Sequence, residues 1–139
     1  PHYPSPTYRF EVEQAGVWPH VRNSSGALED VRTLPHDDGT DGHVILGPMV
    51  NADVALINRS IGLEARMRWS KESFPYCWIW MVWGGIKQYP LWGAHRLVTI
   101  EPFSSPVISL TEAITNGTAL VAEPGGIVSS WVEFTVKEI

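Results

Sequence analysis

Hydrophobic and polar residues alternate along most of this chain with a period of two, the pattern of strands with one buried face. The alternation is clearest over residues 61–69 and 128–136, and a shorter example covers residues 8–12. Residues 43–46 and 54–57 are apolar enough to form inner strands of a sheet. Tyr76–Trp83 is apolar on both faces, so we expect it to lie between layers.

Turn signals separate these runs and indicate many tight connections. The chain has 11 prolines and 12 glycines, and pairs such as Gly84-Gly85 are typical of turns. One short helix is predicted over residues 110–116, because Ser109 and Glu112 have capping-box spacing and Gly117 can end it. The pattern as a whole predicts an all-β protein, an antiparallel β-sandwich.

Length, composition and charge narrow the class of protein. We expect the 139 residues to form a single domain, since 44% are hydrophobic and only 18% are charged. The net charge of −5, with scattered basic residues, argues against a nucleic-acid partner. No apolar stretch reaches the roughly 18–20 residues that span a bilayer, and no signal peptide is recognisable. We therefore expect a cytoplasmic protein with no membrane contact.

The single cysteine, Cys77, lies within the apolar run Tyr76–Trp83. One cysteine excludes an intramolecular disulfide. A reactive thiol needs an electropositive and partly open setting, which this run does not offer. Cys77 is therefore interpreted as a small buried hydrophobic residue.

Glu101 is the carboxylate whose position is most suggestive. It follows a strand-like stretch and precedes Pro102, which cannot donate to a strand ladder, so we expect it at a strand end or bulge. His95 lies six residues earlier, on the same face if the strand is regular. The alternatives are a solvated rim glutamate and a packed, hydrogen-bonded histidine.

The segment 35–43 contains three aspartates and two histidines, which suggests either a metal site or a polar turn. In the register of a calcium-binding loop that starts at Asp37, Gly39 occupies the third position and Pro48 the twelfth. Both of those positions require oxygen ligands. We therefore interpret the segment as a polar turn and expect neither a metal nor a cofactor.

Seven tryptophans in a chain of this length also call for an explanation. Aromatic rings fill sandwich cores, and they also stack on the C–H faces of sugars while carboxylates bind sugar hydroxyls. We expect Trp78 and Trp80 in the core. For Trp92, which lies just before His95, both alternatives stay open.

Two motifs resemble those of the aldose 1-epimerases, or galactose mutarotases. Trp92-Gly93-Ala94-His95 followed by Ile100-Glu101-Pro102 is similar to that family's aromatic-x-x-His…Leu-Glu-x motif. The segment 41–46 resembles its Asp-His-x-Phe-x-Leu segment, with Asp41 in the position of the aspartate. The separation of 60 residues between Asp41 and Glu101 is close to the family's spacing. The likeness covers about residues 35–137.

The resemblance implies the carboxy-terminal part of a galactose-mutarotase-like supersandwich. It implies that Glu101 is the catalytic base of sugar anomer interconversion, and that Asp41 binds sugar hydroxyls. His43, Trp92 and His95 are the further residues expected to contact the sugar or glycoside. Two departures stand out: Gly42 replaces the family's histidine, and the family's histidine acid belongs to a first half that this chain lacks. By position, His2 is the sole candidate for that acid.

Two functions remain open on these grounds. One is a mutarotase-like isomerase with Glu101 as base. The other is a small non-catalytic β-sandwich subunit of a larger carbohydrate-active enzyme. A half-length sandwich would expose sheet edges and apolar faces, so we expect a fragment, an oligomer or a chain with a second protein subunit.

Overall fold

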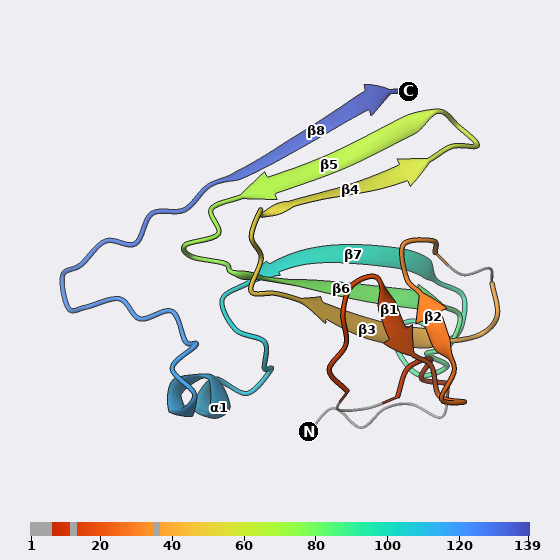
Figure 1. Ribbon diagram of the computed structural model, residues 1–139, viewed down its shortest axis with the longest axis horizontal. Helices are drawn as coiled ribbons and strands as arrows, with labels where there is room; N and C mark the ends of the chain where they lie inside the picture. Colours follow the sequence, from red (N-terminus) through yellow and green to blue (C-terminus); the bar gives the residue numbers. More distant parts are fainter. Residues whose placement is uncertain (1–6, 12–13, 35–36) are drawn as a thin grey trace. The chain divides into compact units, whose positions relative to one another are not determined.

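The computed structural model describes residues 7–11, 14–34 and 37–139. Strands dominate this part of the chain, and they pair in antiparallel fashion (Figure 1). The elements are β1 (His20–Arg22), β2 (Leu28–Asp30), β3 (Asp41–Leu46), β4 (Asp53–Asn58), β5 (Leu63–Trp69), β6 (Tyr76–Trp83), β7 (Arg96–Phe103), α1 (Leu110–Thr115) and β8 (Val132–Glu138). The predicted all-β class with antiparallel sheets is confirmed, and it is consistent with a sandwich-like fold.

The strands form three sheets. β1 and β2 form a two-stranded hairpin, and the two larger sheets have the orders β3-β6-β7 and β4-β5-β8. The runs 43–46 and 54–57, expected as inner strands, do form strands, but β3 and β4 are edge strands of these sheets. Apolar residues in these two strands therefore do not indicate a central position in the sheet, because side-chain packing on one face also favours them in edge strands.

The chain divides into two compact units, each made of two separate segments. The first unit comprises Pro1–Val44 and Ile79–Thr99, and the second comprises Ile45–Trp78 and Ile100–Ile139. The boundaries between the units fall inside the strands β3, β6 and β7.

β6 supplies most of the buried apolar side chains, as its two-sided apolar pattern predicts. Five of its residues are buried: Cys77, Trp78, Ile79, Met81 and Val82. Trp78 stacks on Phe103 with ring centroids 4.9 Å apart, and its indole N–H donates to the carbonyl of Ser105 at 3.1 Å. Trp78 is thus a core residue as expected, whereas Trp80 is only half-buried.

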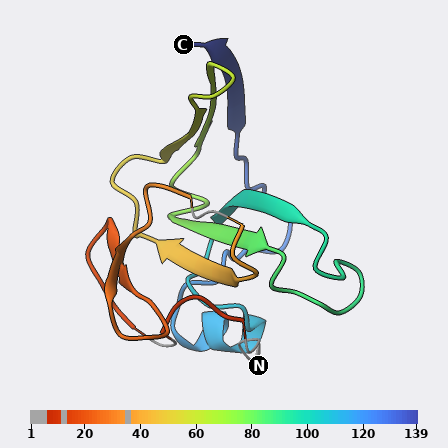
Figure 2. The same cartoon turned by 90° about the vertical axis from the view of Figure 1, so that its right-hand side faces the viewer.

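β4, β5 and β8 run side by side (Figures 1 and 2). The alternation of apolar and polar residues along β5 and β8 gives this sheet two different faces. One face carries charged side chains, and Arg66 there binds Asp53 through two contacts of 2.8 Å. The other face is apolar, and three of its side chains on β8 are exposed: Val132, Phe134 and Val136. The expected exposure of an apolar sheet face is therefore observed among the described residues.

The boundaries of three predicted strands need correction. Residues 61–62 belong to a turn and β5 begins at Leu63, because the pairing with β4 ends at the Asn58–Leu63 pair. Residues 128–131 precede β8, which begins at Val132 opposite Trp69. In residues 8–12, Tyr8 and Phe10 make only isolated bridges to different partners, and residue 12 lies outside the described part.

The helix α1 begins and ends as its capping signals predict. The Ser109 hydroxyl accepts a hydrogen bond from the Glu112 N–H at 3.3 Å, and Asn116 is the carboxy-terminal cap. Gly117 follows with a φ of 73°, the left-handed conformation that favours glycine. No helix within the described residues is long and apolar enough to cross a membrane.

Candidate functional site

Asp41, expected to bind sugar hydroxyls, is the first residue of β3 and is only 3% exposed. Its carboxylate accepts a hydrogen bond of 2.8 Å from the Thr7 hydroxyl, and its backbone carbonyl accepts one of 2.7 Å from the Arg9 N–H. These contacts fasten residues 7–9 to β3. Asp41 thus has a structural role here, and a contact with sugar stays a prediction.

His43 belongs to a row of aromatic rings in the first unit. Its ring stacks on Trp80 with centroids 5.6 Å apart and an interplanar angle of 4°, and on Tyr8 at 6.3 Å. Its backbone N–H donates to the Tyr8 hydroxyl at 3.3 Å. Burial raises the pKa of the Tyr8 phenol, which keeps this hydroxyl neutral. This packing positions His43 firmly and leaves its ring half-buried.

Trp92 and His95 lie close together in the chain segment between β6 and β7. Trp92 is 65% exposed and meets Tyr89 edge-to-face with ring centroids 5.3 Å apart. Its φ of 42° is uncommon for a residue with a side chain. The His95 ring nitrogen Nδ1 lies 3.1 Å from the carbonyl of Leu91, and the residue is exposed. Of the two alternatives for Trp92, core filling is therefore wrong.

Glu101 lies on β7 and is half-buried. β7 continues through Pro102 to Phe103, so Glu101 is inside the strand and two residues from its end. β7 is an edge strand of its sheet, and edge strands are where proline is tolerated. The expectation of a strand end or bulge is corrected accordingly.

The residues that the resemblance groups together do not lie on neighbouring elements. Asp41 is on β3 and Glu101 is on β7, and β6 separates these two strands in the sheet order. Asp41, His43, Trp92 and His95 belong to the first compact unit, and Glu101 belongs to the second. His2 lies outside the described residues.

Cys77 is fully buried, and burial raises the pKa of its thiol to about 11. The neighbouring Glu101 carboxylate acts in the same direction, because it repels the thiolate. The thiol therefore stays protonated at neutral pH, which agrees with its interpretation as a buried hydrophobic residue rather than a nucleophile.

Two aspartates of the polar segment 35–43 bind basic side chains of the protein. Asp37 forms an ion pair of 2.6 Å with Arg96, and Asp38 binds Arg9 and the Thr40 hydroxyl. Desolvation opposes ionisation of Asp38, but the hydrogen bonds from Thr40 and Arg9 outweigh it and lower the carboxyl pKa. In the described ranges, no cluster of three or more metal-ligating side chains is suited to a metal ion.

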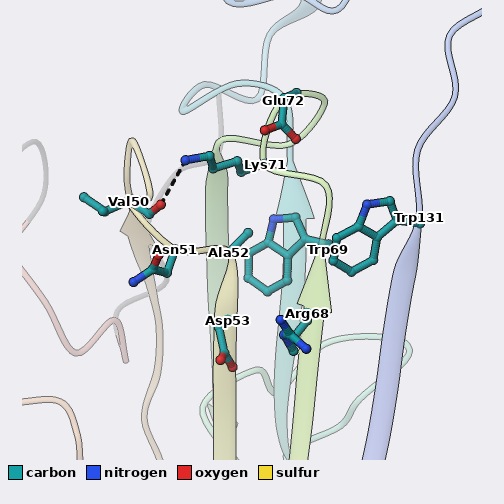
Figure 3. Close-up of a pocket in the computed structure, with 9 residues that line it drawn as sticks. All are labelled: Val50, Asn51, Ala52, Asp53, Arg68, Trp69, Lys71, Glu72 and Trp131. Carbon is teal, nitrogen blue, oxygen red and sulfur yellow. Dashed lines mark hydrogen bonds between the residues drawn. The ribbon is translucent and has the colours of Figure 1, made fainter.

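The second compact unit contains a hollow of about 340 Å³ that the motifs do not point to. Figure 3 shows that its walls come from three segments, around the start of β4, the end of β5 and the residue before β8. Nine residues line it: Val50, Asn51, Ala52, Asp53, Arg68, Trp69, Lys71, Glu72 and Trp131.

Two tryptophans give the hollow its apolar walls. Trp69 is 2% exposed, and its indole N–H donates to the Phe74 carbonyl at 2.8 Å, so its ring is fixed. Trp131 is 53% exposed, and its backbone N–H donates to the Ser70 hydroxyl at 3.2 Å. The hollow therefore combines a rigid inner indole with an outer indole that a ligand can reach.

The polar lining is balanced in charge. Asp53 and Glu72 supply two carboxylates, while Arg68 and Lys71 supply two cations. The Lys71 ammonium donates to the Val50 carbonyl at 3.1 Å, as the dashed line in Figure 3 marks.

Two polar side chains of the lining are available to a ligand. Asn51 and Glu72 make no side-chain hydrogen bond or ion pair among the described residues, and both are exposed. An amide and a carboxylate together offer donors and acceptors for hydroxyl groups.

The sequence contained one signal for this hollow. Trp131 occupies the polar phase of the alternation over residues 128–136, and a large aromatic side chain in that phase is expected to face solvent. Asn51 and Glu72 carried no signal, since only the pairing of β4, β5 and β8 brings their segments together.

Comparisons with protein-family models, with curated proteins and with solved structures found no match to this chain. The likeness to the aldose 1-epimerases thus rests on the motifs, and it stays a prediction.

Proposed function

We propose that this chain is a carbohydrate-binding β-domain and that the sugar binds in the hollow beside Trp131. The observation that carries this proposal is an exposed indole next to an amide and a carboxylate that have no other partner among the described residues. A sugar ring presents a C–H face and a rim of hydroxyl groups. Trp131 suits the former, while Asn51 and Glu72 suit the latter.

The charge balance of the hollow favours a neutral ligand. Two carboxylates and two cations leave no excess of positive charge. A phosphorylated or nucleotide ligand is recognised by clustered cations or by a phosphate-binding helix terminus. The lining therefore supports an uncharged sugar or glycoside better than an anionic one.

The resemblance to galactose mutarotases supports the same class of ligand by an independent route, although it places the sugar near Glu101, Asp41 and Trp92. Anomer interconversion with Glu101 as base is the reaction that it implies. Sugar binding in the hollow does not depend on that reaction.

A second candidate function is a non-catalytic subunit that supports a larger carbohydrate-active enzyme. The observation in its favour is the apolar face of β4, β5 and β8, where Phe134 is 62% exposed and Val136 is 58% exposed. Exposed apolar surface of this kind is typical of interaction sites. In this function the hollow would bind the sugar and so attach the enzyme complex to its carbohydrate substrate.

Calorimetric titration with D-galactose, D-glucose and their methyl glycosides tests the proposed binding. We expect millimolar dissociation constants, and we expect Trp131→Ala to weaken binding about tenfold or more because the stacking face is lost. Trp92→Ala is the matched control, since Trp92 is also an exposed tryptophan but lies in the other unit.

Two outcomes would contradict the proposal in different ways. Loss of binding in Trp92→Ala with full binding in Trp131→Ala would move the site to the residues that the family motif indicates. Absence of binding to every sugar at high millimolar concentration would refute the carbohydrate function itself.

A further inference from the structure

The outer edge of β8 offers a complete set of backbone hydrogen-bonding groups. β8 pairs with β5 on one side, and in the described part of the chain no strand pairs with its other side. The Ile139 N–H donates to the Gly62 carbonyl at 2.9 Å, and the Ser70 N–H donates to the Trp131 carbonyl at 3.1 Å. Both bonds involve odd-numbered residues at the two ends of β8, and the register between them is continuous. The backbone N–H and C=O groups of the odd-numbered residues of β8 therefore point toward β5. The N–H and C=O groups of the even-numbered residues therefore point outward.

β8 lacks two of the features by which proteins block a free edge, a proline and a bulge. Its seven residues, VEFTVKE, include no proline, and its pairing with β5 contains no bulge. A regular edge strand of this length is a template for another strand.

The side chains of β8 carry opposite charges at equal distances from its centre. Glu133 and Lys137 lie two residues on either side of Thr135, on the same face of the sheet. Glu133 lies 3.4 Å from Arg68, and Lys137 lies 3.3 Å from Glu64. A twofold rotation about Thr135 exchanges the two positions, so the strand is complementary in charge to a second copy of itself.

We propose that two copies of this chain pair through β8, antiparallel and centred on Thr135. Glu133 of one copy then lies opposite Lys137 of the second copy, and the rotation repeats this pair. Phe134 and Val136 lie opposite each other as hydrogen-bonded pairs, because their backbone groups point outward. Such an isologous contact closes on itself as a dimer.

This register is favoured over its neighbours by the charges. Centring the pair on Phe134 or Val136 places Thr135 opposite a charged residue and leaves no opposite charges face to face. Centring it on Glu133 or Lys137 sets like charges opposite each other, which destabilises a strand pair. With Thr135 at the centre, a row of alternating charge crosses the dimer, from Arg68 and Glu133 to Lys137 and Glu64 of the second copy.

A charge-reversal experiment tests this register by sedimentation velocity over a range of concentrations. We expect the wild-type chain to dimerise. Glu133→Lys and Lys137→Glu each place like charges opposite each other twice, so we expect each variant alone to dimerise at least about tenfold more weakly. An equimolar mixture restores both opposite-charge pairs in a heterodimer. Recovery of dimer in the mixture is the expected result, while a monomeric wild-type chain or no recovery would overturn the proposal.

Disulfide trapping tests the same register without a change of charge. Thr135 faces Thr135 of the second copy in a non-hydrogen-bonded pair, where the two Cβ atoms come within disulfide range. Under mild oxidation we expect Thr135→Cys to yield covalent dimers rapidly. Thr111→Cys, at an exposed position on α1, is the control, and it should form no covalent dimer because Thr111 lies outside β8. Equal cross-linking of the two variants would contradict the proposed pairing, even if the charge variants fail to fold.

Discussion

Gly85 is the position where a single methyl group should do the greatest local damage. A Cβ atom there would lie 2.6 Å from both the backbone nitrogen and Oδ1 of Asp41, and it would also meet the carbonyl carbon of Thr40. Ordinary contacts between such atoms need roughly 3.5 Å. The substitution Gly85→Ala must therefore move two segments apart by about 1 Å.

The segments are held by several hydrogen bonds that such a movement strains. The Gly85 N–H donates to Thr40 at 3.1 Å, and the Thr7 hydroxyl lies within hydrogen-bonding distance of Asp41 and of the Gly85 carbonyl. Overpacking costs about 1–3 kcal/mol, and a weakened hydrogen bond costs about 1 kcal/mol. The lower entropy of the unfolded alanine chain offsets about 0.7 kcal/mol. We expect Gly85→Ala to lower the free energy of unfolding by about 2–3 kcal/mol.

Urea denaturation followed by tryptophan fluorescence measures this loss. With a slope of about 1.5 kcal/mol per molar urea, the midpoint should fall by about 1.3–2 M. Gly125→Ala is the control, because a Cβ there meets nothing within 4 Å and only the φ of 74° opposes it. That control should lose about 1 kcal/mol. A Gly85→Ala midpoint at or above that of Gly125→Ala would refute the close approach of Gly85 to Asp41.

Two further predictions concern Cys77 and Glu101. Since burial raises the Cys77 pKa from 9.0 to about 11, its thiol should resist Ellman's reagent at pH 8 until denaturant is added. The raised pKa of Cys77 contributes stability that is complete below pH 9 and is lost as pH rises toward 11, so urea midpoints should fall over that range. Cys77→Ala should lose the part of this fall that lies between pH 9 and 10, whereas the raised pKa of Tyr8 still lowers stability above pH 10. If the chain catalyses anomer interconversion, polarimetry of α-D-galactose should show an acceleration that Glu101→Gln abolishes without weakening sugar binding. An unchanged rate in that variant would remove Glu101 from the reaction.

The sequence predicted those elements whose pattern is local. The two-sided apolar run Tyr76–Trp83 became the buried strand β6, and the capping residue Ser109 correctly marked the start of α1. Both depend on neighbours within a few residues. The hairpin of β1 and β2 was missed because three residues are too few to establish a period.

The arrangement of side chains in space was much harder to predict. The sequence did not reveal that Asp41 is buried or that it contacts the distant Thr7. The lining of the hollow is distributed over residues 50–53, 68–72 and 131, which approach one another only through sheet pairing. Long-range strand pairing cannot be recognised from a local sequence pattern. An aromatic residue at a polar position of the alternation, such as Trp131, can be recognised.

Heteronuclear NMR of the tryptophan indole groups tests the central claim most directly. The seven tryptophans give up to seven indole N–H signals, which single substitutions assign. On titration with D-galactose or D-glucose, we predict that the Trp131 signal shifts most, that the side-chain amide of Asn51 shifts with it, and that Trp92 stays unchanged. Saturable shifts at Trp92 without any at Trp131 would contradict binding in the hollow.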